Sequence, residues 1–414
     1  MKVAIVGAGI SGVSFGRILN EDAEVTIFEQ KAHIGGLISC ERVNGYLYHR
    51  VGGHVFNSKN QQVLDWFWKF FDKDTEFIKA KRLAKVYING KFIGYPIEDH
   101  LFEFDNDTLK KIISELLLLK THRNVSNFEA FLKSNFGETL YRLYFQPYNE
   151  KIWNVDLSSV PLEWLEGKLP MPKLIDVFLN NILRHEEDDM VHSFFFYPIN
   201  HGSQFIMDRL ANGLTINRGC MINNIAIDDE NKVFINGIGP YDKMIYTGDV
   251  RKLPELMGDD FPSDYTSVLS LQSNGTTNVL CLCDWNDLSW LYIPEKKFKA
   301  HRIIYTGNFS KSNNIQGGRT SCTVEFSNFV TKEEAIEEIK KLPGNLEFVA
   351  YNYEPNSYVI QDKKTREIIN ELKEFLCLKN IYLLGRFAEW EYYNMDKAIE
   401  SAFSLAKKLN LSAN

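Results

Sequence analysis

The chain has 414 residues, of which 44% are hydrophobic and 24% are charged, and its formal net charge is −7. This length predicts two or three domains, and the composition is that of an ordinary globular protein. The acidic balance argues against nucleic-acid binding as the main function. We expect neither a signal peptide nor a membrane span, since no apolar run approaches roughly 20 residues, and we therefore expect a cytoplasmic protein.

The cysteines give no indication of a metal site. Their spacing does not match that of zinc ligands, and reduced thiols are expected. The six cysteines are Cys40, Cys220, Cys281, Cys283, Cys322 and Cys377.

The first thirty residues contain a dinucleotide-binding pattern. Residues 2–6, "KVAIV", predict a buried parallel strand, and a helical pattern begins near residue 12. Between them stands a G-x-G-x-x-G motif with Gly7, Gly9, Ser11 and Gly12. In this context the glycines allow the backbone to approach a pyrophosphate, and the helix N-terminus favours its charge.

A second strand, "EVTIFEQ", ends near Glu29, 22 residues after Gly7. That spacing predicts that the Glu29 carboxylate binds the ribose hydroxyls. The following Gly35, Gly36 and Leu37 resemble the second glycine motif of FAD-binding proteins in the amine-oxidase-like group. The resemblance implies FAD, whereas the spacing alone leaves NAD open.

The middle of the chain predicts several further units. Asn89-Gly90 predicts the turn of a hairpin, and Pro147 with Asn149 predicts an interruption in a mostly helical region. Residues 241–249, "YDKMIYTGD", predict a strand that returns the chain to the dinucleotide-binding sheet. We also expect a strand, a Gly-Gly turn and a helix over 46–71, a helix within 196–214, turns at 228–231 and Gly239-Pro240, strands over most of 265–360, and helix, strand and helix in the last forty residues.

These patterns predict an α/β fold: a Rossmann-type FAD-binding domain with a mainly helical insertion and an antiparallel β-sheet domain. The first of these domains is expected to be discontinuous. The predicted boundaries are 1–80 with 205–255 and 376–414 for the FAD-binding domain, 101–195 for the helical domain, and 81–100 with 256–375 for the sheet domain.

Near the C-terminus, "GRFAEWEYYNMDKAI" begins at Gly385, where a last strand turns into a last helix. The helix is expected to begin near Asn394, Met395 and Asp396, and its N-terminus would stabilise an anion. The alternative is an ordinary strand-to-helix turn with a capping side chain.

Five segments together resemble the UDP-galactopyranose mutase family nearly from end to end: "VGAGISG", "GGHVFNS", "PYNEKIW", "HRIIYTGNFS" and "GRFAEWEYYNMDKAI". The resemblance implies an isomerase that interconverts UDP-galactopyranose and UDP-galactofuranose, or a close relative of this pair. In the family the cofactor is reduced FAD, whose N5 forms an adduct with the sugar without net redox change. The implied partner is a nucleotide sugar, and a homo-oligomer is left open.

The resemblance also implies roles for individual residues on the cofactor side. Arg386 is expected to contact the FAD, and the residues from Asn394 to Asp396 are expected to face the pyrimidine end of the flavin. His54, which follows a Gly-Gly turn, is expected beside the flavin. We predict that it tunes the conformation or the reduction potential of the flavin, although a lone histidine is more often structural.

On the substrate side, a uracil ring needs an aromatic side chain to stack on. Tyr144, Tyr148 and Trp153 are candidates, and the last two match the family, while the alternative is that they pack a helix face. Arg302 and Tyr358 match family residues that bind the diphosphate, and Asn89 is a further candidate for substrate binding.

Two positions depart from the family. Lys168 stands near the place of a second arginine, and we expect it to replace that guanidinium and bind the phosphate as a point charge. Phe326 is interpreted as replacing a second tyrosine. These departures leave the sugar and the base open. The alternative function is that of an FAD-dependent oxidoreductase of the amine-oxidase or desaturase type. A non-catalytic protein with a Rossmann domain is a third interpretation.

Overall fold

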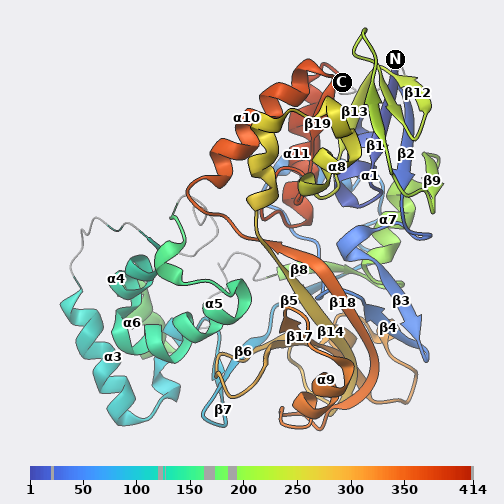
Figure 1. Ribbon diagram of the computed structural model, residues 1–414. Coiled ribbons are helices and arrows are strands. Elements are labelled where there is room, and N and C mark those ends of the chain that lie inside the picture. Colours follow the sequence, from blue (N-terminus) through green and yellow to red (C-terminus); the bar gives the residue numbers. More distant parts are fainter. Residues whose placement is uncertain (20–22, 120–124, 126, 163–172, 185–193, 412–414) are drawn as a thin grey trace.

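The computed structural model describes residues 1–19, 23–119, 125, 127–162, 173–184 and 194–411. These residues form a parallel sheet flanked by helices, a large and mainly antiparallel sheet, and a group of helices to one side of it (Figure 1). In this part of the chain, no helix combines the length and the apolar character that a membrane crossing requires.

The parallel sheet has five strands in the order β19-β13-β1-β2-β9, and every neighbouring pair is parallel. Both strands predicted before residue 30 are confirmed, and so is the returning strand near residue 245, which pairs directly with the first strand. The strands are β1 (Lys2–Val6), β2 (Glu24–Glu29), β9 (Thr215–Arg218), β13 (Lys243–Tyr246) and β19 (Ile381–Leu383).

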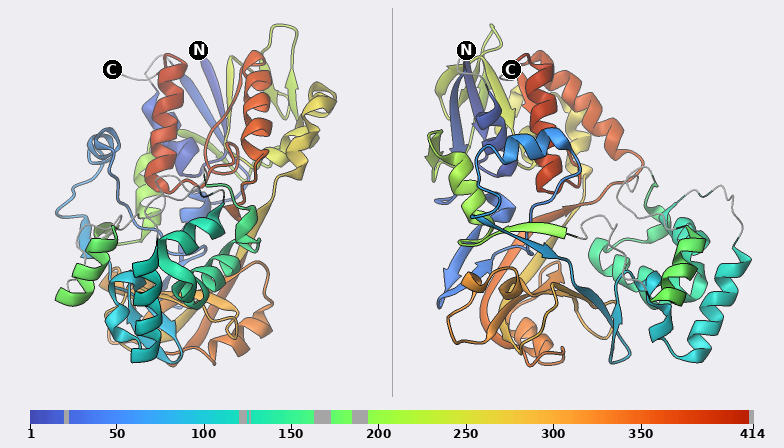
Figure 2. Two further views of the ribbon diagram at one scale, coloured as in Figure 1. Left: turned by 90° about the vertical axis from the view of Figure 1, so that its left-hand side faces the viewer. Right: turned by 180° about the vertical axis from the view of Figure 1, so that it is seen from behind.

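Helices cover both faces of this sheet, as Figure 2 also shows. Alternate side chains of β1 enter different cores: Val3 and Ile5 belong to one, Ala4 and Val6 to the other. This double burial explains the continuous apolar run of β1. The first core includes α1 (Ile10–Ile18), α7 (Ser203–Ala211) and α11 (Met395–Lys408), and the second includes α8 (Leu253–Met257) and α10 (Thr365–Leu378).

A three-stranded antiparallel sheet consists of β10 (Ile225–Ile227), β11 (Val233–Ile235) and β12 (Ile238–Tyr241). The turn predicted at Gly239-Pro240 is wrong, because both residues lie within β12. The chain turns earlier, at Asn236 and Gly237, whose φ values of 50° and 75° suit an Asn-Gly turn. β12 is an edge strand of this sheet, where proline is tolerated. The turn predicted at 228–231 is confirmed.

The large sheet has the order β18-β14-β17-β16-β15-β6-β7. Its neighbouring strands are antiparallel except for the parallel pair β15 and β6. The hairpin turn predicted at Asn89-Gly90 is confirmed between β6 and β7, and α9 (Lys332–Ile339) packs on one face. The strands are β6 (Ala84–Ile88), β7 (Lys91–Gly94), β14 (Ser273–Cys283), β15 (Trp290–Tyr292), β16 (Ala300–Ile304), β17 (Thr320–Ser327) and β18 (Glu347–Val359).

The helical group contains α3 (Asn106–Leu118), α4 (Phe128–Leu140), α5 (Gln146–Trp153) and α6 (Leu174–Leu183). A π-helical segment, residues 141–145, joins α4 to α5. The regular α-helix is therefore interrupted at residues 141–145, before Pro147, and not at Pro147 as predicted. Pro147 lies in the first turn of α5, where a helix does not need its missing N–H, and the helix ends at Asn154 in the left-handed conformation.

Two short antiparallel pairs complete the described elements: β3 (Cys40–Val43) with β4 (Tyr46–His49), and β5 (Phe77–Lys81) with β8 (Phe194–Pro198). The helix α2 (Gln61–Phe67) follows the predicted Gly-Gly turn after β4. We keep the division into three discontinuous domains, with the boundaries given above, as a proposal.

Candidate active site

Glycines bring three loops into contact at the carboxyl edge of the parallel sheet. A Cβ on Gly7 would lie 2.3 Å from Thr247 Oγ1, and one on Gly12 would lie 2.1 Å from the Gly7 carbonyl oxygen. In the second glycine pair, the Gly35 amide donates to the Ala8 carbonyl at 2.9 Å. A Cβ on Gly36 would come within 3.3 Å of the Gly9 Cα. Side chains at these positions would push the loops apart.

Glu29 contacts this glycine loop through its carboxylate. It ends β2 and is 7% exposed, and its carboxylate accepts hydrogen bonds from the backbone amides of Ala8 and Lys31, both at 2.8 Å. A carboxylate has lone pairs for further donors. Leu37 lies half-buried in the single 3₁₀ turn that follows the second glycine pair.

The turn between β19 and α11 approaches the same loop. A Cβ on Gly385, which has a φ of 91°, would lie 2.4 Å from Ser11 Oγ. The Arg386 guanidinium donates to the backbone carbonyls of Tyr393 and Ser357, and it lies 4.6 Å from the centre of the Tyr392 ring. Its side chain therefore fastens the turn to β18.

The helix α11 begins at Met395, as predicted. Its N-cap residue Asn394 is exposed and makes no capping hydrogen bond with its side chain, and α1 is likewise uncapped at Gly9. Asp396, in the first turn of α11, has a pKa raised by burial. Two packed helices thus begin close to the same glycine loop, where their dipoles favour an anion.

This arrangement fits a dinucleotide. The glycines leave backbone where side chains would stand, the helix N-termini favour phosphate, and Glu29 is at the end of the second strand. The structure brings together the loops of the residues that the sequence assigned to dinucleotide binding, and we call this arrangement the dinucleotide cradle. These residues are Gly7, Gly9, Ser11, Gly12, Gly35 and Gly36.

A second group of polar residues lies on the large sheet. It consists of His301, Arg302, Glu325 and Tyr358 and is called the Arg302 group below. In β16, one terminal nitrogen of Arg302 donates to Glu325 Oε1 at 2.8 Å and to the Tyr358 hydroxyl at 2.9 Å. His301 reaches the same carboxylate oxygen at 2.9 Å. The Arg302 Nε is buried and has no hydrogen-bond partner within the described chain. Arg302 is therefore oriented from one side and retains donor capacity on the other.

Glu325 is the acid that orients Arg302. It is 1% exposed on β17. Burial alone would raise the pKa of the Glu325 carboxyl. The charge of Arg302 and the hydrogen bond to His301 more than offset that effect and hold its pKa well below the usual range. Glu325 therefore stays ionised at neutral pH, and the sequence analysis did not identify it.

His54 follows a Gly-Gly turn that packs against the Arg302 group. The preceding Gly52 and Gly53 allow a close approach, because a Cβ would lie 3.1 Å from Glu325 Oε2 and 2.6 Å from Ile304 Cγ2 respectively. Burial, followed by the charges of Arg386 and Arg302, lowers the pKa of His54 to about 4. Its Nε2 is buried and has no hydrogen-bond partner among the described residues. His54 is thus neutral at pH 7.

Three aromatic rings from distant parts of the chain form a wall beside Arg302. Tyr358 of β18 stacks on Tyr392 with ring centres 5.6 Å apart and planes 7° apart. Trp153, at the end of α5, meets both rings edge-on at 5.7 Å. Trp153 and Tyr358 were predicted to bind substrate, but Tyr392 was not. The available signal was its position between Arg386 and Asn394, inside the most specific of the five segments.

Tyr148 and Tyr144 differ in position. Tyr148 lies edge-on to Tyr292 at 5.3 Å and near His301 at 6.4 Å, so it borders the Arg302 group. Tyr144 stacks behind Tyr148 at 5.4 Å and is buried in the core of the helical group. The structure brings Tyr148 to the site and gives Tyr144 the surroundings of a packing residue.

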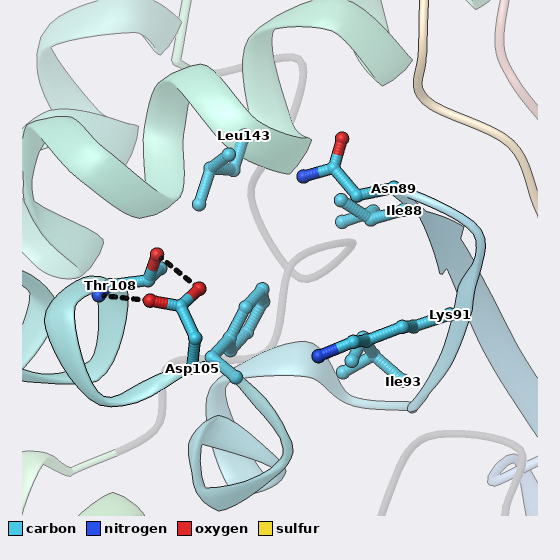
Figure 3. Close-up of a pocket in the computed structure, with 8 residues that line it drawn as sticks. Ile88, Asn89, Lys91, Ile93, Asp105, Thr108 and Leu143 are labelled. Atoms are coloured by element: carbon cyan, nitrogen blue, oxygen red, sulfur yellow. Dashed lines mark hydrogen bonds between the residues drawn. The ribbon is translucent and has the colours of Figure 1, made fainter.

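Asn89 is not part of this group. Asn89 occupies the hairpin turn between β6 and β7 and lines a small cavity of about 60 Å³ beside α3 (Figure 3). Ligand pockets for small molecules are several times larger. Apart from Asn89, none of the candidate site residues lines this cavity. Lys168 lies outside the described residues.

The interpretation of Phe326 as a substituted tyrosine of the substrate site is wrong. Successive residues of a strand point to opposite faces of a sheet. Glu325 faces Arg302, whereas Phe326 is fully buried with Cys322 and Val324 in the core on the other face. The absence of a hydroxyl at position 326 therefore leaves the Arg302 group unchanged.

Comparisons with known proteins agree with this architecture. Residues 5–73 match a family model described as an NAD(P)-binding Rossmann-like domain. A UDP-galactopyranose mutase of Mycoplasma genitalium is 23% identical over 98% of this chain and 94% of its own. A dTDP-fucopyranose mutase of Escherichia coli is 25% identical over 98% of this chain and 97% of its own.

Among solved structures, a reduced UDP-galactopyranose mutase has a TM-score of 0.86 at 22% identity, and the match covers 100% of this chain and 96% of that one. These findings confirm the resemblance to the UDP-galactopyranose mutase family and the α/β fold with a Rossmann domain and an antiparallel sheet. They also confirm the expected class of enzyme, a mutase-type isomerase.

Proposed function

We propose that this chain is a flavin-dependent mutase that interconverts the pyranose and furanose forms of a nucleotide-linked sugar, with UDP-galactose as the first candidate. The proposed cofactor is FAD, active when reduced. One observation carries the proposal: the Arg386 guanidinium, in the turn beside the glycine loop, donates to the Ser357 carbonyl at 2.8 Å, and the hydroxyl of the next residue, Tyr358, accepts a hydrogen bond from Arg302 at 2.9 Å. The dinucleotide cradle and the Arg302 group therefore lie next to each other.

On the cofactor side, the residues would bind and orient. The glycine loops admit a pyrophosphate to the N-terminus of α1, and Glu29 can accept the ribose hydroxyls. The N-terminus of α11 favours negative charge at the ring system. The chemistry that reduced FAD supplies when bound is nucleophilic, toward the anomeric carbon of the sugar.

On the substrate side, the residues fit a nucleoside diphosphate. Arg302 is a permanent cation, held by Glu325 and Tyr358, with a buried Nε donor that no described residue uses. Trp153 and Tyr148 offer aromatic surface for a base at the end of α5. A diphosphate needs such a cation, whereas the small amines and hydrocarbons of related oxidoreductases do not.

The nucleotide and the sugar are part of the proposal. The relatives are named for UDP-galactopyranose and for dTDP-fucopyranose, so both pairs are candidate substrates. We put UDP-galactose first because the resemblance in the sequence motifs points to that family.

The test is a conversion assay on purified, FAD-loaded protein. UDP-galactofuranose and dTDP-fucofuranose are incubated separately, with and without dithionite, and the nucleotide sugars are separated by anion-exchange chromatography. We expect conversion of UDP-galactofuranose to the pyranose only in the presence of dithionite. Conversion of the dTDP sugar alone would support the proposed mutase activity but replace UDP-galactose as the proposed substrate.

Conversion of neither sugar by a yellow, FAD-loaded protein would contradict the proposed substrates. The alternative of an oxidoreductase predicts net oxidation of an added substrate, measured as bleaching of the flavin absorbance without dithionite. That outcome would replace the mutase proposal.

A further inference from the structure

Arg82 is a half-buried cation that has no carboxylate partner among the described residues. It lies between β5 and β6, and one terminal nitrogen donates to the Tyr292 hydroxyl. Its Nε atom is buried and has no hydrogen-bond partner in the part of the chain that the structure describes. The guanidinium remains protonated at any physiological pH. A charge that is partly removed from water without a counterion destabilises a fold, so its presence calls for an explanation.

Aromatic rings provide part of that explanation. The Arg82 guanidinium carbon lies 4.9 Å from the Trp290 ring centre, 5.4 Å from that of Tyr95 and 5.9 Å from that of Tyr292. Such contacts offset part of the desolvation of the guanidinium but supply no negative charge. The rings also fix the direction of the guanidinium plane.

Arg82 is adjacent to the Arg302 group. Tyr292, which accepts its hydrogen bond, is the cross-strand partner of Arg302 between β15 and β16. Tyr148 lies edge-on to Tyr292, with ring centres 5.3 Å apart. Tyr292 therefore stands between two cations, one paired with Glu325 and one with no acid partner among the described residues.

We propose that Arg82 is a second anion-binding guanidinium of the substrate site and that it binds the diphosphate of the nucleotide sugar together with Arg302. This inference deepens the proposed function and rests on it for the identity of the anion. The sequence analysis gave this role to Lys168. Arg82 differs from a lysine because its planar fork presents paired donors to phosphate.

The test compares Arg82→Met and Arg82→Lys with wild type in the FAD-loaded protein. Affinities for UDP, dTDP, uridine and inorganic pyrophosphate are measured by calorimetry. We expect Arg82→Met to weaken UDP binding about 10–100-fold, as loss of a charge-assisted hydrogen bond does. We expect uridine binding to change less than about 2-fold, since uridine has no phosphate, and Arg82→Lys to be intermediate.

Two variants serve as comparisons. Arg319→Met removes the same charge from an exposed position between Asp284 and Glu347 and should leave UDP binding unchanged. Lys168→Ala tests the position assigned from sequence, and a larger loss there than at Arg82 would overturn the inference. Flavin content and melting temperature verify that each variant is folded.

The outcomes separate this inference from the proposed function. Equal losses for UDP and uridine in Arg82→Met would mean that Arg82 only supports the aromatic residues, and the inference would fall. Wild type that binds UDP, with Arg82→Met binding it equally well, would overturn the inference alone. If wild type binds pyrophosphate but neither nucleotide, and Arg82→Met loses the pyrophosphate, the anion site would be supported and the proposed nucleotide-sugar function would be overturned.

Discussion

At the scale of single residues, the site depends on charges that are held inside the protein. Glu325 is ionised although it is buried, because Arg302 and His301 surround it. His54 is neutral although it is a base, because burial and two arginines oppose its protonation. Neighbouring residues thus keep one buried acid ionised, chiefly through Arg302, whereas burial and the charge of Arg386 chiefly keep one buried base neutral.

His54 should make the stability of the protein depend on pH in mildly acidic solution. Its pKa is about 4 in the folded protein and about 6.5 when unfolded. Between these values the unfolded chain binds more protons, so the free energy of unfolding falls as the pH falls. The slope from this residue approaches about 1.4 kcal/mol per pH unit.

The variant His54→Gln cannot titrate, so its free energy of unfolding should fall less steeply between pH 6.5 and pH 4 than that of wild type. Urea unfolding of the FAD-loaded proteins at a series of pH values measures this. His49, whose pKa burial and then the charge of His54 lower to about 3, is present in both proteins, so their difference reports the titration of His54 together with its effect on His49. Parallel curves would contradict the neutral His54.

At the scale of elements, the position of α5 relative to the large sheet determines the aromatic wall. Lys151 on this helix donates to three backbone carbonyls, those of Ile293 at 2.9 Å, Glu295 at 2.7 Å and Ala300 at 3.0 Å. Ile293 and Glu295 lie in the connection between β15 and β16, and Ala300 is the first residue of β16. One ammonium group therefore fastens the helix that carries Trp153 to the strand that carries Arg302.

Replacing Lys151 by methionine should loosen this attachment. Loss of hydrogen bonds from a charged donor to buried carbonyls should lower the free energy of unfolding by about 2–3 kcal/mol. Because α5 carries Tyr148 and Trp153, the KM for the nucleotide sugar should rise about 10-fold while bound FAD is retained. Chemical unfolding, steady-state kinetics and flavin absorbance measure the three effects.

The matched control is Lys340→Met, at the C-cap of α9, where the side chain is 60% exposed and the ammonium pairs with Glu337 alone among the described residues. An exposed pair of this kind contributes about 0–1 kcal/mol, so both stability and KM should stay near wild type. A Lys151→Met protein with wild-type KM would show that α5 keeps its place without the lysine.

At the scale of the whole molecule, the proposed cofactor would join parts of the chain that are distant in sequence. The glycine loop after β1, the second glycine pair and the turn before α11 meet at one edge of the parallel sheet (Figure 1). Helix N-termini and a charged guanidinium lie next to one another there, and a bound dinucleotide would contact all of them.

Removal of FAD should therefore lower the melting temperature. A ligand that binds only the folded state at 100–1,000 times its Kd stabilises it by about 3–4 kcal/mol, which in a protein of this size amounts to several degrees or more. Differential scanning fluorimetry of the loaded and stripped proteins, with FAD added back as the control, measures the shift. Equal melting temperatures would contradict the proposed dinucleotide cradle.

Much of this protein is determined by local patterns in its sequence. The G-x-G-x-x-G motif, the strands on either side of it and the start of α11 are local features, because glycine conformation, apolar runs and helix starts depend on neighbouring residues. The Asn89-Gly90 turn is local for the same reason. The prediction of a turn at Gly239-Pro240 was wrong because the pair Asn236-Gly237, which precedes it in the chain, suits a hairpin turn better.

Only the tertiary structure decided which side chains share the site. Phe326 and Glu325 are neighbours in sequence but face opposite sides of β17, so one packs the core and the other orients Arg302. Tyr392, Tyr358 and Trp153 come from three separate elements, and Arg82 meets Tyr292 across 210 positions of the chain. Strand register and the packing of α5 on the sheet set these contacts, and neither can be determined from local sequence patterns.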